Sequence, residues 1–400
     1  NSNETEPKLR ALFSHAVDLP EFTETETDQF IKAISEAKIL DPACGSGAFP
    51  MGVLHRLVDL LNKLDPKNKR WNELQIQRAI DETAGVYREG NNSEERKLRL
   101  DEIEKAFDLS MNYPDYARKL FLIENCIYGV DIQQIAIQIS KLRFFIALIV
   151  DQKVNDTKSN RNILSMPNLE TKFVAANTLI GLDKPKQMTL MASDVEQLEK
   201  ELSSIRHKIF FTRKYSAKKV LKKTEKGKRE ELQKALENSG YTKNVAGQMA
   251  GWNPFDPINS AKFFDPETMF GFKNGFDIVI GNPPFVSYYA RRSAKLDTAT
   301  LRYYQKHYDF ITDTKLDGKF NTIMFFIEKA SRLSNDNANI FFILDVAFND
   351  VPYRYIRKYL LDNTTINKVI NGLSDFENAY SDQVLLQFSK SKQTNNNTEN

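Results

Sequence analysis

Short apolar runs alternate with longer amphipathic stretches along most of this chain of 400 residues. Short apolar runs are typical of buried strands, and apolar positions three or four residues apart indicate helices. The predicted strands are 37–41, 127–132, 172–176, 276–280, 340–344, 366–370 and 383–388. The predicted helices are 49–64, 135–150, 321–333 and 353–361. This alternation predicts an α/β fold, with a mostly parallel seven-stranded sheet and helices on both faces.

Two stretches interrupt the alternation and predict two largely helical insertions. Residues 65–120 are polar and charged without a strand pattern, and residues 185–270 begin with a long charged helical pattern. The main domain is therefore expected over 36–390, with insertions at about 65–120 and 185–270. Residues 1–35 are interpreted as an N-terminal helical segment. Residues 391–400 are expected to be a disordered tail or a cut linker.

Composition narrows the function classes. The chain has 56 Lys and Arg against 53 Asp and Glu, so its net charge of +3 is not that of a strongly basic nucleic-acid binder. Any basic surface for nucleic acid must therefore come from a local cluster of Lys and Arg. Two cysteines and four scattered histidines exclude a disulfide framework and indicate no metal site. We find neither a signal peptide nor an apolar run that could span a membrane, which favours a cytoplasmic protein.

A Gly-containing turn follows the first predicted strand. Residues 41–47 read Asp-Pro-Ala-Cys-Gly-Ser-Gly, and Gly45 and Gly47 allow a tight turn and a close approach to a ligand. The following helix offers free N–H groups that suit the carboxylate of an amino-acid-like ligand. The spacing is neither that of a dinucleotide fingerprint nor that of a P-loop. An ordinary strand-to-helix turn remains the alternative.

Two polar residues follow the next two strands. Asp131 ends the second strand, where a carboxylate can hold ribose hydroxyls, or can cap the helix that begins near Gln133. Asn177 follows the third strand, where its amide can contact an adenine edge, or can form a turn. The sequence leaves both pairs of alternatives open.

Phe276-Asp-Ile-Val-Ile-Gly-Asn-Pro-Pro-Phe285 is the most informative stretch. Its two prolines fix the local shape and remove two backbone donors. The side-chain oxygen of Asn282 and the carbonyl of Pro283 are two acceptors that suit an NH₂ group, and Phe285 can stack on a planar base or amide. The alternative is a proline-rich strand exit with a packed Phe.

The pair of motifs DPACGSGAF at 41–49 and GNPPF at 281–285 resembles the amino-type S-adenosylmethionine-dependent DNA methyltransferases. Among these it resembles the N6-adenine type in which the cofactor motif precedes the catalytic motif along the chain. The stretch from Phe264 to Phe285 resembles the methylase part of type IIG restriction-modification enzymes. The resemblance covers about 36–390 and is weakest in the two insertions. It implies a Rossmann-like class I methyltransferase fold and S-adenosyl-L-methionine as the cofactor.

The resemblance also implies roles for individual residues. The positions that match the cofactor site are Asp41, Pro42, Ala43, Cys44, Gly45, Gly47, Phe49, Asp131, Ile132 and Asn177. Many relatives carry Asp at the position of Asn177. The positions that match the catalytic motif are Asn282, Pro283, Pro284 and Phe285. This motif more commonly ends in Tyr, and Phe285 keeps the stacking face without the hydroxyl. Phe376 matches a residue that stacks on the other side of the target base, and a core Phe is an equal alternative.

The implied reaction is direct in-line transfer of a methyl group to N6 of an adenine that has flipped out of double-stranded DNA. Rivals are methylation of RNA guanine N2 or of a protein glutamine, and a non-catalytic DNA-binding module with a vestigial pocket. Nuclease and target-recognition domains are expected to be missing from this chain, so we predict a catalytic-domain fragment. Residues 206–229 hold eleven Lys and Arg and one acid, Glu225. This segment either contacts DNA phosphates or is a solvated insertion.

Overall fold

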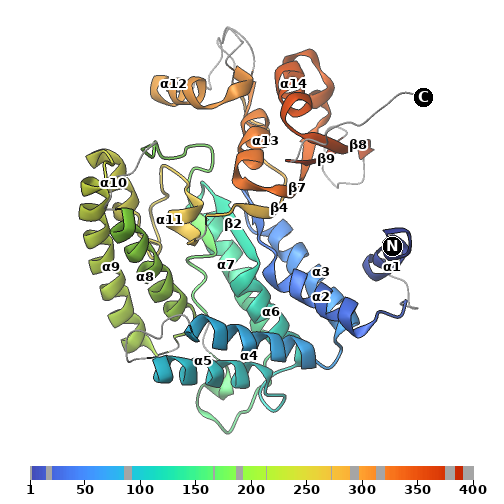
Figure 1. Ribbon diagram of the computed structural model, residues 1–400, viewed down its shortest axis with the longest axis vertical. Coiled ribbons are helices and arrows are strands. Elements are labelled where there is room, and N and C mark those ends of the chain that lie inside the picture. Colours follow the sequence, from blue (N-terminus) through green and yellow to red (C-terminus); the bar gives the residue numbers. More distant parts are fainter. Residues whose placement is uncertain are drawn as a thin grey trace.

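The computed structural model in Figure 1 describes residues 2–14, 20–84, 92–164, 167–185, 192–212, 214–271, 273–288, 297–311, 320–373 and 383–390. Helices α8, α9 and α10 stand together at one side of the molecule, and helices α12, α13 and α14 lie at one end of it. None of the helices in the described part of the chain combines the length and the apolar character that crossing a bilayer requires.

A seven-stranded sheet forms the centre of the molecule. Its strands are β1 (Ile39–Asp41), β2 (Ile127–Asp131), β3 (Phe173–Ala175), β4 (Phe276–Gly281), β7 (Ser334–Asp345), β8 (Thr365–Leu373) and β9 (Gln383–Ser389), in the order β3-β2-β1-β4-β7-β9-β8. Neighbours from β3 to β7 are parallel, and β9 is antiparallel to both β7 and β8. The predicted mostly parallel sheet of seven strands is confirmed.

Side chains of the central strands alternate between two cores, as the period of two in a strand requires. In β2, Ile127 belongs to one core and Tyr128 to the other, and in β3 Phe173 and Val174 divide in the same way. The first core lies against α3 (Ala48–Leu64), α6 (Pro114–Asn125) and α7 (Gln134–Ile149). The second lies against α13 (Thr322–Leu333) and α14 (Arg354–Asn363). Helices therefore cover both faces, as predicted.

The join between β1 and β4 brings together segments that are far apart in the sequence. The backbone N–H of Lys38 donates to Oδ2 of Asp277 at 2.7 Å, across a separation of 239 residues, and the N–H of Asp277 donates to the carbonyl of Lys38 at 2.9 Å. The carboxyl ends of β1 and β4 consequently lie side by side at one edge of the sheet.

The N-terminal segment and the first insertion are helical. They contain α1 (Ser2–Phe13), α2 (Glu24–Glu36), α4 (Lys69–Ala84) and α5 (Asn92–Phe107). Helix α2 begins with a capping box, in which Thr23 and Glu26 each accept the other's backbone N–H. The fully buried Trp71 of α4 and Ile103 of α5 join the same core as α3 and α6, so the insertion extends that core.

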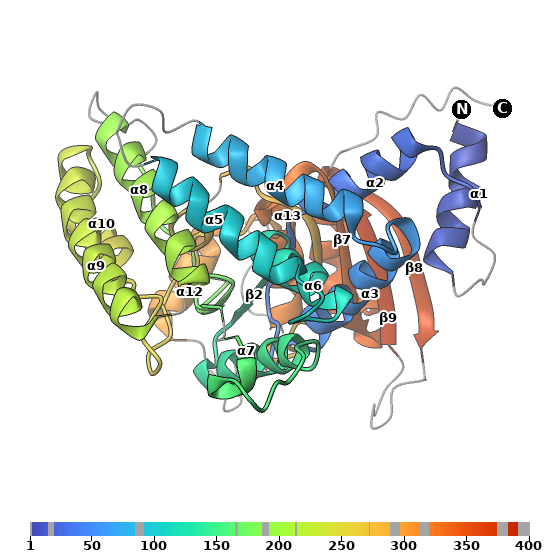
Figure 2. The ribbon, with the colours of Figure 1, turned by 90° about the horizontal axis from the view of Figure 1, so that it is seen from below.

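The second insertion has a core of its own. It contains α8 (Ala192–Phe211), α9 (Tyr215–Asn238) and α10 (Lys243–Gly251), and a loop leads from them to α11 (Pro266–Phe270). Leu202, Leu232 and Met249, one from each of the three long helices, are buried against one another. Figure 2 shows the three helices stacked beside α5, away from β7–β9. The remaining elements are α12 (Thr298–His307), β5 (Ser287–Tyr288), β6 (Phe320–Asn321) and the short 3₁₀ helices η1 (Ser159–Asn162), η2 (Asp309–Ile311), η3 (Val346–Asn349) and η4 (Val351–Tyr353).

The basic segment 206–229 divides into buried and exposed residues. Glu225 is fully buried and accepts from both Arg206 at 2.9 Å and Arg229 at 2.9 Å. These two arginines hold α8, α9 and α10 together and do not form part of a phosphate-binding surface. Lys219 and Lys223 belong to the exposed remainder of the segment.

Candidate active site

The turn after β1 has the shape that its glycines predict. Gly45 and Gly47 have φ angles of +53° and +83°, which residues with a side chain rarely adopt. Gly47 is the N-cap of α3 and supplies no side-chain acceptor, so the first N–H groups of the helix lack a side-chain cap. Phe49, in the same turn of α3, is partly buried. These free N–H groups can bind a ligand carboxylate.

Asp131 fastens this turn to the end of β2. Its Oδ2 accepts the backbone N–H of Gly45 at 2.9 Å, and its Oδ1 accepts that of Gln133 at 2.8 Å. Ser140 of α7 donates to the carbonyl of Gly45 at 2.9 Å, and the N–H of Cys44 donates to Val130 at 2.9 Å. The turn is therefore held from three directions. A carboxylate oxygen accepts more than one hydrogen bond, so Asp131 retains capacity for a hydroxyl.

Asp41, the first residue of the turn 41–47, lies against the end of β4. It is 2% exposed, and burial raises the pKa of its carboxyl to about 8, although the N–H of Ala43 donates to it at 3.1 Å. A Cβ at Gly281, the last residue of β4, would lie 2.7 Å from its Oδ1. Only glycine fits at this position without a shift of Asp41. The turn 41–47 and the segment after Gly281 are thus neighbours.

The loop after β3 approaches the same place. Thr178 is buried and donates to the carbonyl of Pro42 at 2.7 Å. The side-chain oxygen of Asn177 accepts the N–H of Leu179 at 3.1 Å, which is the turn role that the sequence left open. Ile132 is 58% exposed, and its carbonyl accepts from Ser260 at 2.7 Å.

Thr322, the first residue of α13, fixes the Asn-Pro-Pro-Phe segment. Its hydroxyl donates to the carbonyl of Pro284 and accepts the N–H of Val286 at 3.0 Å. Asn282 is exposed and Pro283 is buried. Among the described residues, neither the side chain of Asn282 nor the carbonyl of Pro283 has a hydrogen-bond partner. Phe285 is partly buried and packs at the edge of the core.

The structure brings together the predicted residues of the two motifs, Asp131 and Asn177 at the carboxyl ends of β1, β2, β3 and β4. Phe376 lies outside the described residues, so its predicted stacking role stays a prediction. The supporting residues Ser140, Thr178 and Thr322 were not predicted. Each acts through its side-chain hydroxyl, and nothing in the local sequence distinguishes it from other Ser or Thr residues.

Comparison with known proteins finds restriction-modification proteins that are similar to this chain. A protein of Methanocaldococcus jannaschii, named as a type II restriction enzyme and methyltransferase, is 23% identical over 89% of this chain and 30% of that protein. The M protein of the type I restriction enzyme EcoKI is 12% identical over 94% of this chain and 45% of its own, with a TM-score of 0.37. The type IIG restriction endonuclease BpuSI is 13% identical over 94% of this chain and 26% of its own, with a TM-score of 0.34.

The chain spans about 30% of the length of the curated relative. Its strand order, β3-β2-β1-β4-β7-β9-β8 with β9 antiparallel to its neighbours, agrees with the Rossmann-like α/β fold that the sequence predicts. Residues 125–377, more than half of the chain, match the family of Eco57I restriction-modification methylases. This match includes Asp131, Asn177 and the Asn-Pro-Pro-Phe segment, and the chain belongs to the Eco57I restriction-modification methylase family.

Proposed function

We propose that this chain transfers a methyl group from S-adenosyl-L-methionine to the N6 amino group of adenine in DNA. The observation that carries the proposal is the Asn-Pro-Pro-Phe segment. Thr322 binds its second half, while Asn282 and the carbonyl of Pro283, beside the turn 41–47, keep acceptors that no described residue occupies. A pair of fixed acceptors next to a ligand-binding turn suits the transfer of a group to a primary amine.

The residues around the turn 41–47 fit the cofactor. The uncapped start of α3 suits the carboxylate of its amino-acid part, and Asp131 suits the ribose hydroxyls. The exposed side chain of Ile132 and the amide of Asn177 would contact the adenine. When bound, the cofactor supplies an electrophilic methyl group on a sulfonium.

The target nitrogen needs activation because its lone pair is delocalised into the adenine ring. Asn282 Oδ1 and the carbonyl of Pro283 would accept the two amino hydrogens and localise the pair. Phe285 would stack on the base, and Pro284 would hold the shape of the segment. Flipping the base costs a few kcal/mol, and stacking returns about 1–3 kcal/mol per base, so the ring of residue 285 matters more than a hydroxyl on it.

The proposed partner is double-stranded DNA. Since the chain spans about 30% of its curated relative, we place nuclease and target-recognition functions in parts of the protein outside this chain. The exposed lysines of α9, such as Lys219 and Lys223, are proposed to contact phosphates without reading sequence. The proposed location is the cytoplasm.

The test is methyl transfer from labelled S-adenosylmethionine into duplex DNA, RNA and total protein, with nucleoside analysis. N6-methyladenine in DNA is the expected product. Label in RNA guanine or in protein glutamine would show that the substrate is RNA or protein and that the methyl-transfer chemistry is unchanged. If none is labelled, calorimetry separates two outcomes: cofactor binding would show that the recognition module is required, and no binding would favour the vestigial-pocket interpretation.

Replacing Asn282 by Ala tests the assigned chemistry. Loss of one fixed acceptor is expected to lower kcat by about 10²–10³-fold. Cofactor affinity, measured by calorimetry, should stay within threefold (about 0.65 kcal/mol). Asn337→Ala is the matched control, because Asn337 is an exposed Asn near the opposite end of the sheet. Equal rates for Asn282→Ala and Asn337→Ala would overturn the mechanism.

A further inference from the structure

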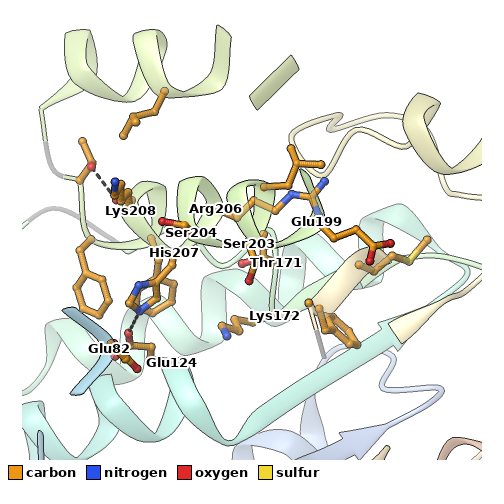
Figure 3. Close-up of a pocket in the computed structure, with 18 of the residues that line it drawn as sticks. Glu82, Glu124, Thr171, Lys172, Glu199, Ser203, Ser204, Arg206, His207 and Lys208 are labelled. Atoms are coloured by element: carbon orange, nitrogen blue, oxygen red, sulfur yellow. Dashed lines mark hydrogen bonds and ion pairs between the residues drawn. The ribbon is translucent and has the colours of Figure 1, made fainter. Parts of the chain in front are cut away.

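A cavity of about 990 Å³ lies between the two insertions, at the amino-terminal ends of β2 and β3. Tyr128 near the start of β2 and Lys172 just before β3 form part of its floor. The candidate active site lies at the other end of the same strands, roughly 10 Å further along β2 at Asp131. Figure 3 shows Lys172 between the pair Glu124–His207 and the side chain of Glu199. The cavity is therefore separate from the methyl-transfer site.

The meeting of the two insertions creates this space. The guanidinium of Arg99, from α5, stacks 3.8 Å from the ring centre of Phe211 at the end of α8. Glu124 at the end of α6 binds both Arg99 and His207 at 2.5 Å. These contacts close one end of the cavity. Apolar side chains from the second insertion and α11 line the opposite wall: Leu202, Leu232, Met249 and Met269.

The floor carries cationic donors without matching acceptors. Among the described residues, Nζ of Lys172 has no hydrogen bond or ion pair, and it lies over the Tyr128 ring, 4.8 Å from the ring centre. The side chain of Arg99 is 10% exposed. Its Nη1 forms an ion pair with Glu102 at 3.8 Å, and its Nε has no hydrogen-bond acceptor in the described part of the chain. Burial lowers the pKa of Lys172 to about 8, so the charge is costly and is still present at neutral pH.

Five glutamates line the cavity, and four of them have cationic partners. Glu102 lies 3.8 Å from Nη1 of Arg99, and Glu199 lies 3.9 Å from Nζ of Lys273. Glu124 already serves Arg99 and His207. Glu267, on the far wall, binds Lys184 at 2.8 Å and Lys273 at 2.7 Å. In the described part of the chain, Nζ of Lys172 and Nε of Arg99 are thus donors without an acceptor, and Oε2 of Glu124 is an acceptor without a donor. The wall above them is mostly apolar.

We propose that this cavity binds a small anionic amphiphile, whose carboxylate, phosphate or sulfonate lies at Lys172 and Arg99 and whose aromatic or aliphatic body packs against Leu202, Leu232 and Met249. The volume is that of a site for a drug-sized molecule, and a few polar groups in a mostly apolar pocket are typical of such sites. The inference does not depend on the proposed methyltransferase activity. It assigns the two insertions a ligand site of their own.

The test uses the fluorescent dye 8-anilinonaphthalene-1-sulfonate and its uncharged relative N-phenyl-1-naphthylamine. We expect one equivalent of the sulfonate to bind, with and without S-adenosylhomocysteine. Lys172→Met should weaken sulfonate binding about tenfold or more, because a charge-assisted contact is lost. Binding of the uncharged dye should not change. Decanoate and decyl phosphate should displace the sulfonate, and the stronger competitor identifies the preferred head group.

Two further variants serve as controls for Lys172→Met. Lys172→Arg retains the charge and should keep the affinity within about threefold, and Lys226→Met removes an exposed lysine that does not line the cavity. The protein with Lys172→Met should melt at a higher temperature without ligand, because an unpaired partly buried charge is gone. Equal sulfonate affinity of Lys172→Met and Lys226→Met, displacement of the dye by S-adenosylhomocysteine, or no displacement by either competitor would overturn the proposal.

Discussion

The hydroxyl of Thr322 offers a direct test of how the Asn-Pro-Pro-Phe segment is positioned. Thr322 is 6% exposed and joins α13 to the segment through Pro284 and Val286. Thr322→Val replaces the hydroxyl by a methyl group of similar size. The shape of the side chain is kept and its two hydrogen bonds are lost.

The expected loss follows from these two bonds. Each contributes about 0.5–1.5 kcal/mol net, so the free energy of unfolding should fall by about 1–3 kcal/mol. The backbone bond from the N–H of Thr322 to the carbonyl of Val286, at 3.0 Å, remains and keeps the segment near its place. A displacement on the order of 1 Å at reacting groups costs about 10²-fold in rate, so we expect kcat to fall by about one to two orders of magnitude.

The assay combines urea unfolding with methyl transfer at saturating cofactor. Thr322→Ser is the matched control, since it retains the hydroxyl and loses only a methyl group. We expect the Ser variant to keep most of the rate, and the Val variant to lose rate while its affinity for the cofactor stays near that of the unchanged protein. If the Val variant methylates as fast as the Ser variant, Thr322 does not position the segment and the reasoning is refuted.

Two other predictions concern packing and pH. Gly281→Ala would place a Cβ 2.7 Å from Oδ1 of Asp41, and should cost about 1–3 kcal/mol of unfolding free energy and weaken cofactor binding. The control Gly52→Ala in α3 meets nothing within 4 Å and should be neutral or stabilising. Calorimetry and urea unfolding compare the two variants, and equal effects would contradict the packing argument. Burial alone would raise the pKa of Glu124, but Arg99 and His207 outweigh it and lower the pKa to about 2. The ionised carboxylate of Glu124 therefore stabilises the fold fully above its ordinary pKa of 4.5, and this stabilisation is lost as the pH falls toward 2. Glu124→Gln should accordingly reduce the loss of unfolding free energy between pH 5 and pH 3. An unchanged pH profile of stability in this variant would count against the prediction.

The sheet could be predicted from the sequence because its strands carry strong local signals. All seven predicted strands overlap strands of the structure. The largest difference is β7, which begins at Ser334, six residues before the predicted start at Ile340. Residues 334–339 are mostly polar and have no apolar strand pattern. Only Ser334 and Asn339 pair with β4, and the register is irregular between them.

The site was predictable in its two motifs and in Asp131 and Asn177, which end or follow predicted strands. Gly45, Gly47 and the Asn-Pro-Pro-Phe segment have unusual backbone requirements that the residue types themselves reveal. Thr322 and Thr178 act through contacts with residues 38 and 136 positions away, and no local pattern predicts such contacts. The basic segment was misleading for the same reason, because Arg206 and Arg229 meet Glu225 only after α8 and α9 have packed.

The pairing of Lys38 with Asp277 also sets an order of events during synthesis. At about 5–20 residues per second, the 239 residues between them take roughly 10–50 s to emerge, so β1, β2 and β3 exist long before β4 can join them. The turn that is proposed to hold the cofactor can therefore form early, and the segment that is proposed to hold the target base is added late. Nascent chains stalled before residue 276 should accordingly be more open to proteases along the free edge of β1 than chains stalled after residue 345. Until β4 docks, that edge is an unpaired strand, and the nascent chain is exposed to mispairing for as long as these 239 residues take to be translated, more than half of which belong to the two insertions.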